Sequence, residues 1–157
     1  MKNERDMSEL HPLICEAIRD RGQFVPVPKC VRMLPTIVPL KESIVLVDKG
    51  ILQKNDIVLY KRNNGMYVAH RIISIKNGEY IMCGDNQIAL EKGILDSMII
   101  AKVDRILKED GSVVDSQQIK SRGRMIVLGL KRTRKKAVDK VKRMLYPVYR
   151  LIFKREK

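Results

Sequence analysis

The sequence predicts a mainly β protein that carries a short helix at its N-terminus and a basic helix at its C-terminus. Short apolar, β-branched runs separated by turn-forming residues fill the middle of the chain, and apolar residues recur at helical spacing near both ends. The 157 residues suit one domain with appended structure, and an apolar content of 45% is enough for a packed core. We therefore expect an N-terminal helix in residues 1–21, a β domain in 22–119 and a basic amphipathic helix in 120–157.

The first element is an amphipathic helix over residues 9–21. Proline is tolerated in the first turn of a helix, where Pro12 falls, and Gly22 is suited to end it. The apolar residues at helical steps are Leu10, Leu13, Ile14, Ala17 and Ile18.

The middle of the chain reads as a series of short strands. Asn63-Asn64-Gly65 and Lys76-Asn77-Gly78 stand between apolar runs at hairpin spacing. Many short strands with frequent turns are typical of a coiled or barrel-like antiparallel sheet. The expected extended segments are 24–27, 44–47, 57–60, 67–73, 79–83, 98–103 and 105–107, and a last hairpin turns at 110–111.

The positive charge of the chain is concentrated in its last quarter. Residues 1–119 hold 17 Lys and Arg against 16 Asp and Glu, whereas residues 120–157 hold 15 against 2. An apolar stripe runs through the same segment, so we expect it to lie on an anionic membrane surface. A nucleic-acid-binding arm and a solvated helix without a partner are the two alternatives. The cations expected at the membrane are Lys131, Arg132, Arg134, Lys135, Lys136, Lys140, Lys142 and Arg143.

Cysteine usage and hydropathy indicate the compartment. Cys15, Cys30 and Cys83 are odd in number and lack metal-ligand spacing, which favours a reducing environment. The polar N-terminus does not read as a signal peptide, and no apolar run reaches transmembrane length. We expect a cytoplasmic protein, peripheral at the inner membrane face, with no metal and no cofactor.

Four short segments carry a family resemblance. Residues 30–35 read C-V-R-M-L-P, residues 55–58 N-D-I-V, residues 70–72 H-R-I and residues 84–86 G-D-N. In this order, on a β-rich chain, they resemble the signal-peptidase/LexA-type serine peptidases, whose corresponding motifs are G-x-S-M-x-P, G-D-I-V, H-R-[IV] and G-D-N. The resemblance covers residues 22–111.

The resemblance implies a fold, a reaction and a set of site residues. The fold would be a signal-peptidase/LexA-like coiled β-sheet, and the reaction would be hydrolysis of a peptide bond by a serine nucleophile. His70 would be the general base, and Asp85 would orient its imidazole. Met33 and Pro35 would line the groove for an extended peptide, and Asp56 would be a structural residue of its turn.

The nucleophile position departs from the family pattern because it is occupied by Arg32. A guanidinium stays protonated and delocalised, so it cannot attack a carbonyl. Cys30 lies about 6–7 Å away along an extended chain, too far for a base aligned with position 32. We therefore expect an impaired site, in which Arg32 forms a charge-assisted pair with Asp85.

Simpler interpretations stay open for these residues. His70 is also consistent with a plain strand histidine, and Asp85 with a turn residue that binds its own backbone. The function expected first is that of a serine-endopeptidase family protein with impaired catalysis, acting on an extended peptide or precursor protein. The alternative is a non-catalytic, membrane-associated peptide-binding protein, and a nucleic-acid-binding regulator ranks last.

Overall fold

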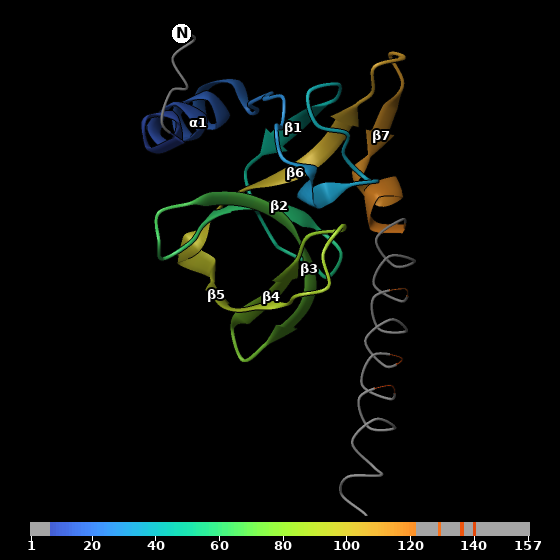
Figure 1. Ribbon diagram of the computed structural model, residues 1–157. Helices are drawn as coiled ribbons and strands as arrows, with labels where there is room; N and C mark the ends of the chain where they lie inside the picture. The colour runs from blue at the N-terminus through green and yellow to red at the C-terminus, as the bar shows by residue number, and fades with distance from the viewer. Residues whose placement is uncertain (1–6, 122–128, 130–135, 137–139, 141–157) are drawn as a thin grey trace, which may run out of the picture.

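The computed structural model describes residues 7–121 together with residues 129, 136 and 140, and the side chains from residue 11 onward. Within these residues the protein is mainly β, which confirms the expected fold class: seven strands form one antiparallel sheet (Figure 1). The sheet order is β1-β6-β2-β3-β4-β5, and β7 also pairs with β6. The strands are β1 Ser43–Val47, β2 Ile57–Lys61, β3 Tyr67–Lys76, β4 Glu79–Cys83, β5 Glu91–Leu95, β6 Ile99–Leu107 and β7 Val113–Asp115.

The N-terminal helix is present as α1, Met7–Arg21. Pro12 therefore lies inside the helix rather than in its first turn as predicted. Gly22 follows with φ 73°, a left-handed conformation that glycine adopts without steric cost, so the helix ends where expected. Among the described residues, no helix is both long and apolar enough to cross a bilayer.

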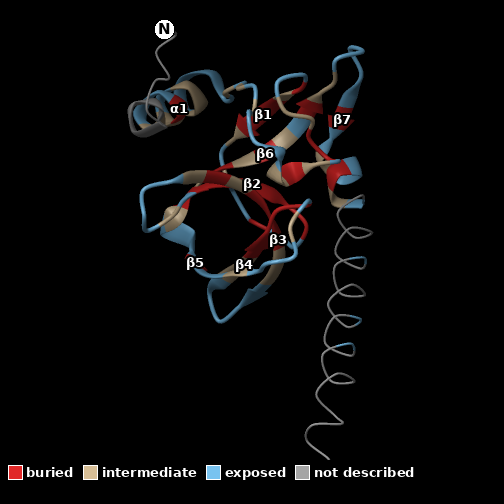
Figure 2. Cartoon of the chain, viewed as in Figure 1, coloured by how far each residue is buried: buried red, intermediate tan, exposed pale blue. Residues whose placement is uncertain are grey.

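The sheet is curled, so that both faces of β2 are buried (Figure 2). Because side chains alternate along a strand, Ile57 and Leu59 enter one apolar cluster while Val58 and Tyr60 enter the other. The first cluster also receives Ile14 from α1, which covers that face. Strand β2 is thus the wall between two cores, and its continuation through the hairpin into β3 fixes the position of β3.

Residues 24–27 are extended, as predicted. The backbone of Phe24 exchanges hydrogen bonds of 2.9 and 2.8 Å with Leu46, and the Ile44 N–H donates to the carbonyl of Pro26. This pairing along β1 carries the chain from α1 to residue 30. The segment after residue 30 therefore lies on the same face of the sheet as α1.

Two local features differ from the sequence prediction. Residues Val31–Met33 form a single 3-10 turn, η1, closed by the Leu34 N–H donating to the Val31 carbonyl, so the chain between Cys30 and Arg32 is not extended as expected. Strand β5 was not predicted, because its sequence E-K-G-I-L lacks an alternating apolar pattern. It nevertheless pairs with β4 through Tyr80 and Ile94.

The basic helix expected in residues 120–157 falls almost entirely outside the described residues. Residues 116–121 are helical after β7, and Ile119 is buried against the first core. Of the eight cations expected at a membrane, Lys136 and Lys140 are described, and both are exposed. The membrane and nucleic-acid interpretations of this segment stay predictions.

The double burial of β2 makes its side chains sensitive to truncation. Replacing Ile57, which is 0% exposed, by alanine is expected to lower the free energy of unfolding by about 2–5 kcal/mol, because it removes buried methyl groups and leaves a cavity. The matched change Ile51→Ala, at a position 87% exposed, should stay within about 0.5 kcal/mol. Urea denaturation measures both, and equal effects would contradict the described core.

Candidate functional site

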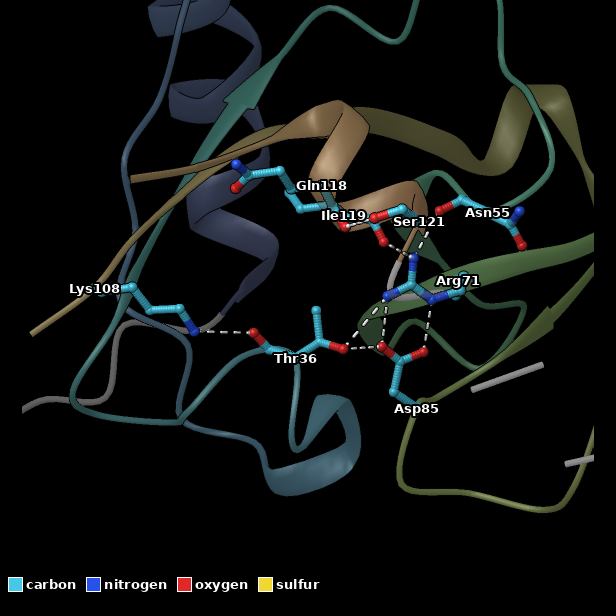
Figure 3. Close-up of polar contacts among 8 residues, drawn as sticks. All are labelled: Thr36, Asn55, Arg71, Asp85, Lys108, Gln118, Ile119 and Ser121. Carbon is cyan, nitrogen blue, oxygen red and sulfur yellow. Dashed lines mark hydrogen bonds and ion pairs between the residues drawn. The ribbon is translucent and has the colours of Figure 1, made fainter. Parts of the chain in front are cut away.

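The Arg71 guanidinium is the centre of the polar interior (Figure 3). Arg71 lies on β3 and is 0% exposed, which is tolerable only if its charge and its donors are satisfied. Its Nε and Nη2 donate to the two carboxylate oxygens of Asp85 at 2.8 and 2.6 Å, a bidentate pair. Nη1 donates to the carbonyls of Asn55 and Ile119 at 2.8 and 3.0 Å, and Nη2 also approaches Thr36 Oγ1.

This network decides the role of Asp85. The Thr36 hydroxyl also donates to Asp85 Oδ2, so the carboxylate is occupied by Arg71 and Thr36 instead of by Arg32, contrary to the expected pair. The reason is strand alternation: His70 and Arg71 are neighbours on β3 and point to opposite faces, and it is Arg71 that meets Asp85. Asp85 thus holds the turn after β4 against the body of the protein instead of accepting a hydrogen bond from His70.

The groups that hold His70 come from other strands. His70 is 1% exposed, and its Nδ1 lies 3.1 Å from the hydroxyl of Tyr60 on β2. Tyr60 donates its only proton to Glu91 on β5 at 2.7 Å. The Tyr60 oxygen must then accept from His70 Nδ1–H, and this hydrogen-bond network assigns the tautomer in which Nε2 carries a lone pair. Among the described residues, Nε2 has no hydrogen-bond partner.

Burial and charge set the protonation of this cluster. Burial lowers the pKa of His70 to about 4; the Glu91 carboxylate opposes this, and the cations of Arg62 and Arg32 add to it. Burial would raise the pKa of Glu91, but hydrogen bonds from Arg62 and Tyr60 hold it below its usual value. Glu91 accepts from both Arg62 Nε and Nη2, at 2.7 and 2.6 Å. The His70 imidazole is therefore neutral at pH 7, and the nearby Glu91 carboxylate is bound by Arg62.

The backbone of η1 contacts the turn that follows β4. The Asn86 N–H donates to the Arg32 carbonyl at 2.9 Å. A Cβ added to Gly84 would lie 2.6 Å from that carbonyl oxygen and 3.1 Å from His70 Nε2, so both flank the space that a glycine leaves free. The unpartnered imidazole nitrogen and the backbone of residue 32 thus meet at one place.

A free sheet edge opens beside η1. In the β2–β3 ladder, Arg62 N–H donates to Met66 O and Ile72 N–H donates to Asp56 O, so hydrogen-bonded pairs fall at every second residue of β3. The N–H and C=O of Tyr67 and Ala69 must therefore point away from β2. Strand β4 pairs with β3 only from Arg71 onward, and within the described residues no strand covers the edge at 67–69.

This edge borders a cleft of about 70 Å³. Met33 contributes to its wall, whereas Pro35, the other residue expected in a peptide groove, is exposed and is not among the lining residues. A ligand pocket for a small molecule usually measures about 300–1,000 Å³, so this cleft suits one side chain of a larger ligand. The lining residues are Pro28, Cys30, Arg32, Met33, Ile37, Tyr67, Val68 and Ala69.

No protein-family model matches the chain, and no curated protein matches it either. The resemblance to the signal-peptidase/LexA-type peptidases stays a prediction from four short motifs. The four segments do come together: η1 with Arg32, the β3 segment with His70 and the Gly84-Asp85-Asn86 turn are in mutual contact, and residues 55–58 pair with the β3 segment.

Tyr60, Glu91 and the role of Arg71 were not predicted from the sequence. Tyr60 could have been found from strand alternation, because Val58 pairs with His70 and Tyr60 shares the face of Val58. Arg71 was visible in the H-R-I motif, and its position next to His70 implies that the two residues face opposite sides of the strand. No sequence signal pointed to Glu91, which lies on the strand that was not predicted.

Breaking the Arg71–Asp85 pair should be costly. Asp85→Asn removes the charge that compensates a buried guanidinium, and we expect a loss of about 3–5 kcal/mol in the free energy of unfolding. The control Asp104→Asn removes a carboxylate from a surface pair with Arg105 and should change it by less than about 1 kcal/mol. Guanidinium denaturation of both variants measures the difference. Similar losses would contradict the central role of Arg71.

The low pKa of His70 makes stability depend on pH. The unfolded imidazole takes up a proton near its ordinary pKa of 6.5, whereas the folded one does so near 4. Stability should therefore fall as pH drops from 6.5 to 4, because only the unfolded state gains the proton in this window. An NMR titration of the His70 imidazole should give a midpoint near 4 in the folded protein and near 6.5 in urea. A folded midpoint near 6.5 would show that the imidazole is solvated.

Proposed function

We propose that the protein is a signal-peptidase-like peptide-binding protein whose catalytic site has degenerated. The observation that carries this proposal is the free edge of β3, with the Tyr67 and Ala69 backbone turned outward, next to the position where the family has its nucleophile. An extended peptide can add to such an edge as a further strand, so that backbone hydrogen bonds provide affinity and side-chain pockets provide specificity.

The proposed fold is the signal-peptidase/LexA-like coiled sheet. It is supported by the contact of the four motif segments and by the curl that wraps β3–β5 around the second core. In that arrangement a bound peptide would run along residues 67–69 and pass residue 32. A serine at residue 32 would stand next to His70 Nε2, whose tautomer is that of a general base.

Arg32 explains why hydrolysis is not part of the proposal. Its side chain has no lone pair for attack on a carbonyl, and its charge acts on His70 to disfavour the imidazolium that general-base catalysis would form. The Tyr60–Glu91 pair remains in place to orient His70. The proposed machinery thus retains the base and its support but lacks the nucleophile.

The experiment that tests this proposal restores the nucleophile. Arg32→Ser should make the protein react with a fluorophosphonate probe at residue 32, whereas the wild-type protein should not react. Adding His70→Gln to that variant should slow labelling about 100-fold or more, because the general base is lost. Circular dichroism checks that each variant is folded.

The matched control is Cys30→Ser, which introduces the same hydroxyl two residues away and should give no labelling. Two outcomes would contradict the proposal. The first is hydrolysis of peptides by the wild-type protein that His70→Gln abolishes. The second is a folded Arg32→Ser variant that the probe never labels, which would mean that residue 32 does not face His70 in the manner proposed.

A further inference from the structure

The charge of Arg32 is not balanced by the acidic groups around it. The two carboxylates at the site belong to Asp85 and Glu91, and each is already held by a different guanidinium, Arg71 and Arg62. Among the residues that the structure describes, no carboxylate lies within ion-pair distance of Arg32, although this residue is half-buried and lines the cleft. A half-buried cation without a partner favours an anion from outside.

The strand register decides which side chains of a bound peptide would meet this cation. Residues directly opposite each other in an antiparallel pair project to the same face. Tyr67 packs on the first core, the face on which Met33 and Ile37 also lie. Peptide residues opposite Tyr67 and Ala69 would therefore direct their side chains toward η1, and these two peptide positions are separated by one residue.

The remainder of the cleft is apolar and small. Met33 and Ile37 are 4% and 1% exposed, and Ala69 leaves the space above β3 open. A small apolar cleft of about 70 Å³ favours a short aliphatic side chain. The two peptide positions on this face thus meet different surroundings, one cationic and one aliphatic.

We propose that the groove selects an extended peptide in which an acidic side chain and a small aliphatic side chain are separated by one residue, with the carboxylate bound by Arg32. This proposal rests on the proposed function, because it specifies the occupant of the same groove. Arg32 is then a specificity-determining residue, because its guanidinium, at the nucleophile position, binds the acidic side chain of the peptide.

The test uses the full chain and four fluorescein-labelled, acetylated and amidated seven-residue peptides at 150 mM salt. The first carries Glu and Val separated by one residue in a Ser/Thr background. The second and third replace Glu by Gln or Lys, and the fourth places Glu and Val side by side, on opposite faces of the strand. Anisotropy should show that the first binds about tenfold more tightly than each of the others, because a charge-assisted hydrogen bond or the apolar contact is lost in them.

Variants of the protein separate recognition by Arg32 from general attraction to a chain of net charge +14. Arg32→Gln should remove the preference for Glu over Gln, and Arg32→Glu should reverse it so that the Lys peptide binds best. Arg19→Gln, an exposed cation on α1 outside the cleft, should leave the preference unchanged. If Arg19→Gln lowers the preference as much as Arg32→Gln, the inference is wrong.

Amide chemical shifts distinguish failure of this inference from failure of the proposed function. If all four peptides bind equally and shift the amides of Tyr67 and Ala69, the groove binds peptides but does not select for charge, and only the inference is overturned. If no peptide shifts those two amides at millimolar concentration, both the inference and the proposed function are overturned.

Discussion

The structure depends on one buried ion pair, that between Arg71 and Asp85. A guanidinium has five N–H donors, and here they reach three separate parts of the chain: the turn at Asp85, the turn before β2 at Asn55 and the helical residue Ile119. Such a charge is costly to bury unless every donor is used, so each of these parts has a fixed position relative to β3. The geometry of the site follows, because the Asp85 turn also anchors η1 through the Asn86 N–H and the Arg32 carbonyl.

A second constraint is the distribution of charge over three arginines and two carboxylates. Arg71 and Arg62 each bind one carboxylate in a bidentate manner, which leaves Arg32 without an acidic partner among the described residues. In an active peptidase of the kind resembled, a neutral hydroxyl would occupy this place and the local charge would balance. With arginine there, the site has an excess of positive charge, which disfavours an imidazolium at His70 and favours an anionic ligand.

The sequence predicted the parts of the molecule that follow from periodicity. Alternating apolar residues and Asn-Gly turns gave the β2–β3–β4 meander, and the helical spacing in 9–21 gave α1. The motifs gave the proximity of residues 32 and 70 but not the bonding between side chains. Asp85 was expected to bind Arg32 and to orient His70, but it binds Arg71 instead. His70 and Arg71 are adjacent on β3 and face opposite sides, and the motif alone does not state which of the two faces Asp85.

Two other features, η1 and strand β5, could not be predicted from the periodicity of the sequence. η1 contains β-branched and flexible residues in a Cys-Val-Arg-Met run that is compatible with an extended chain, and only its tertiary contacts select the turn. Strand β5 has only two apolar side chains, at adjacent positions, and it closes the second core with Ile94 and presents Glu91 to Tyr60. Both features depend on contacts with residues distant in sequence.

Amide hydrogen exchange on the full chain tests the central claim most directly, namely that the edge of β3 is open and receives a peptide strand. The account predicts that the Ala69 amide exchanges about 100-fold or more faster than the amides of Val68 and His70, which bond to β2, and that a saturating bound peptide slows Ala69 selectively. An Ala69 amide as strongly protected as Val68 in the free protein would contradict the account, because the edge would already be occupied.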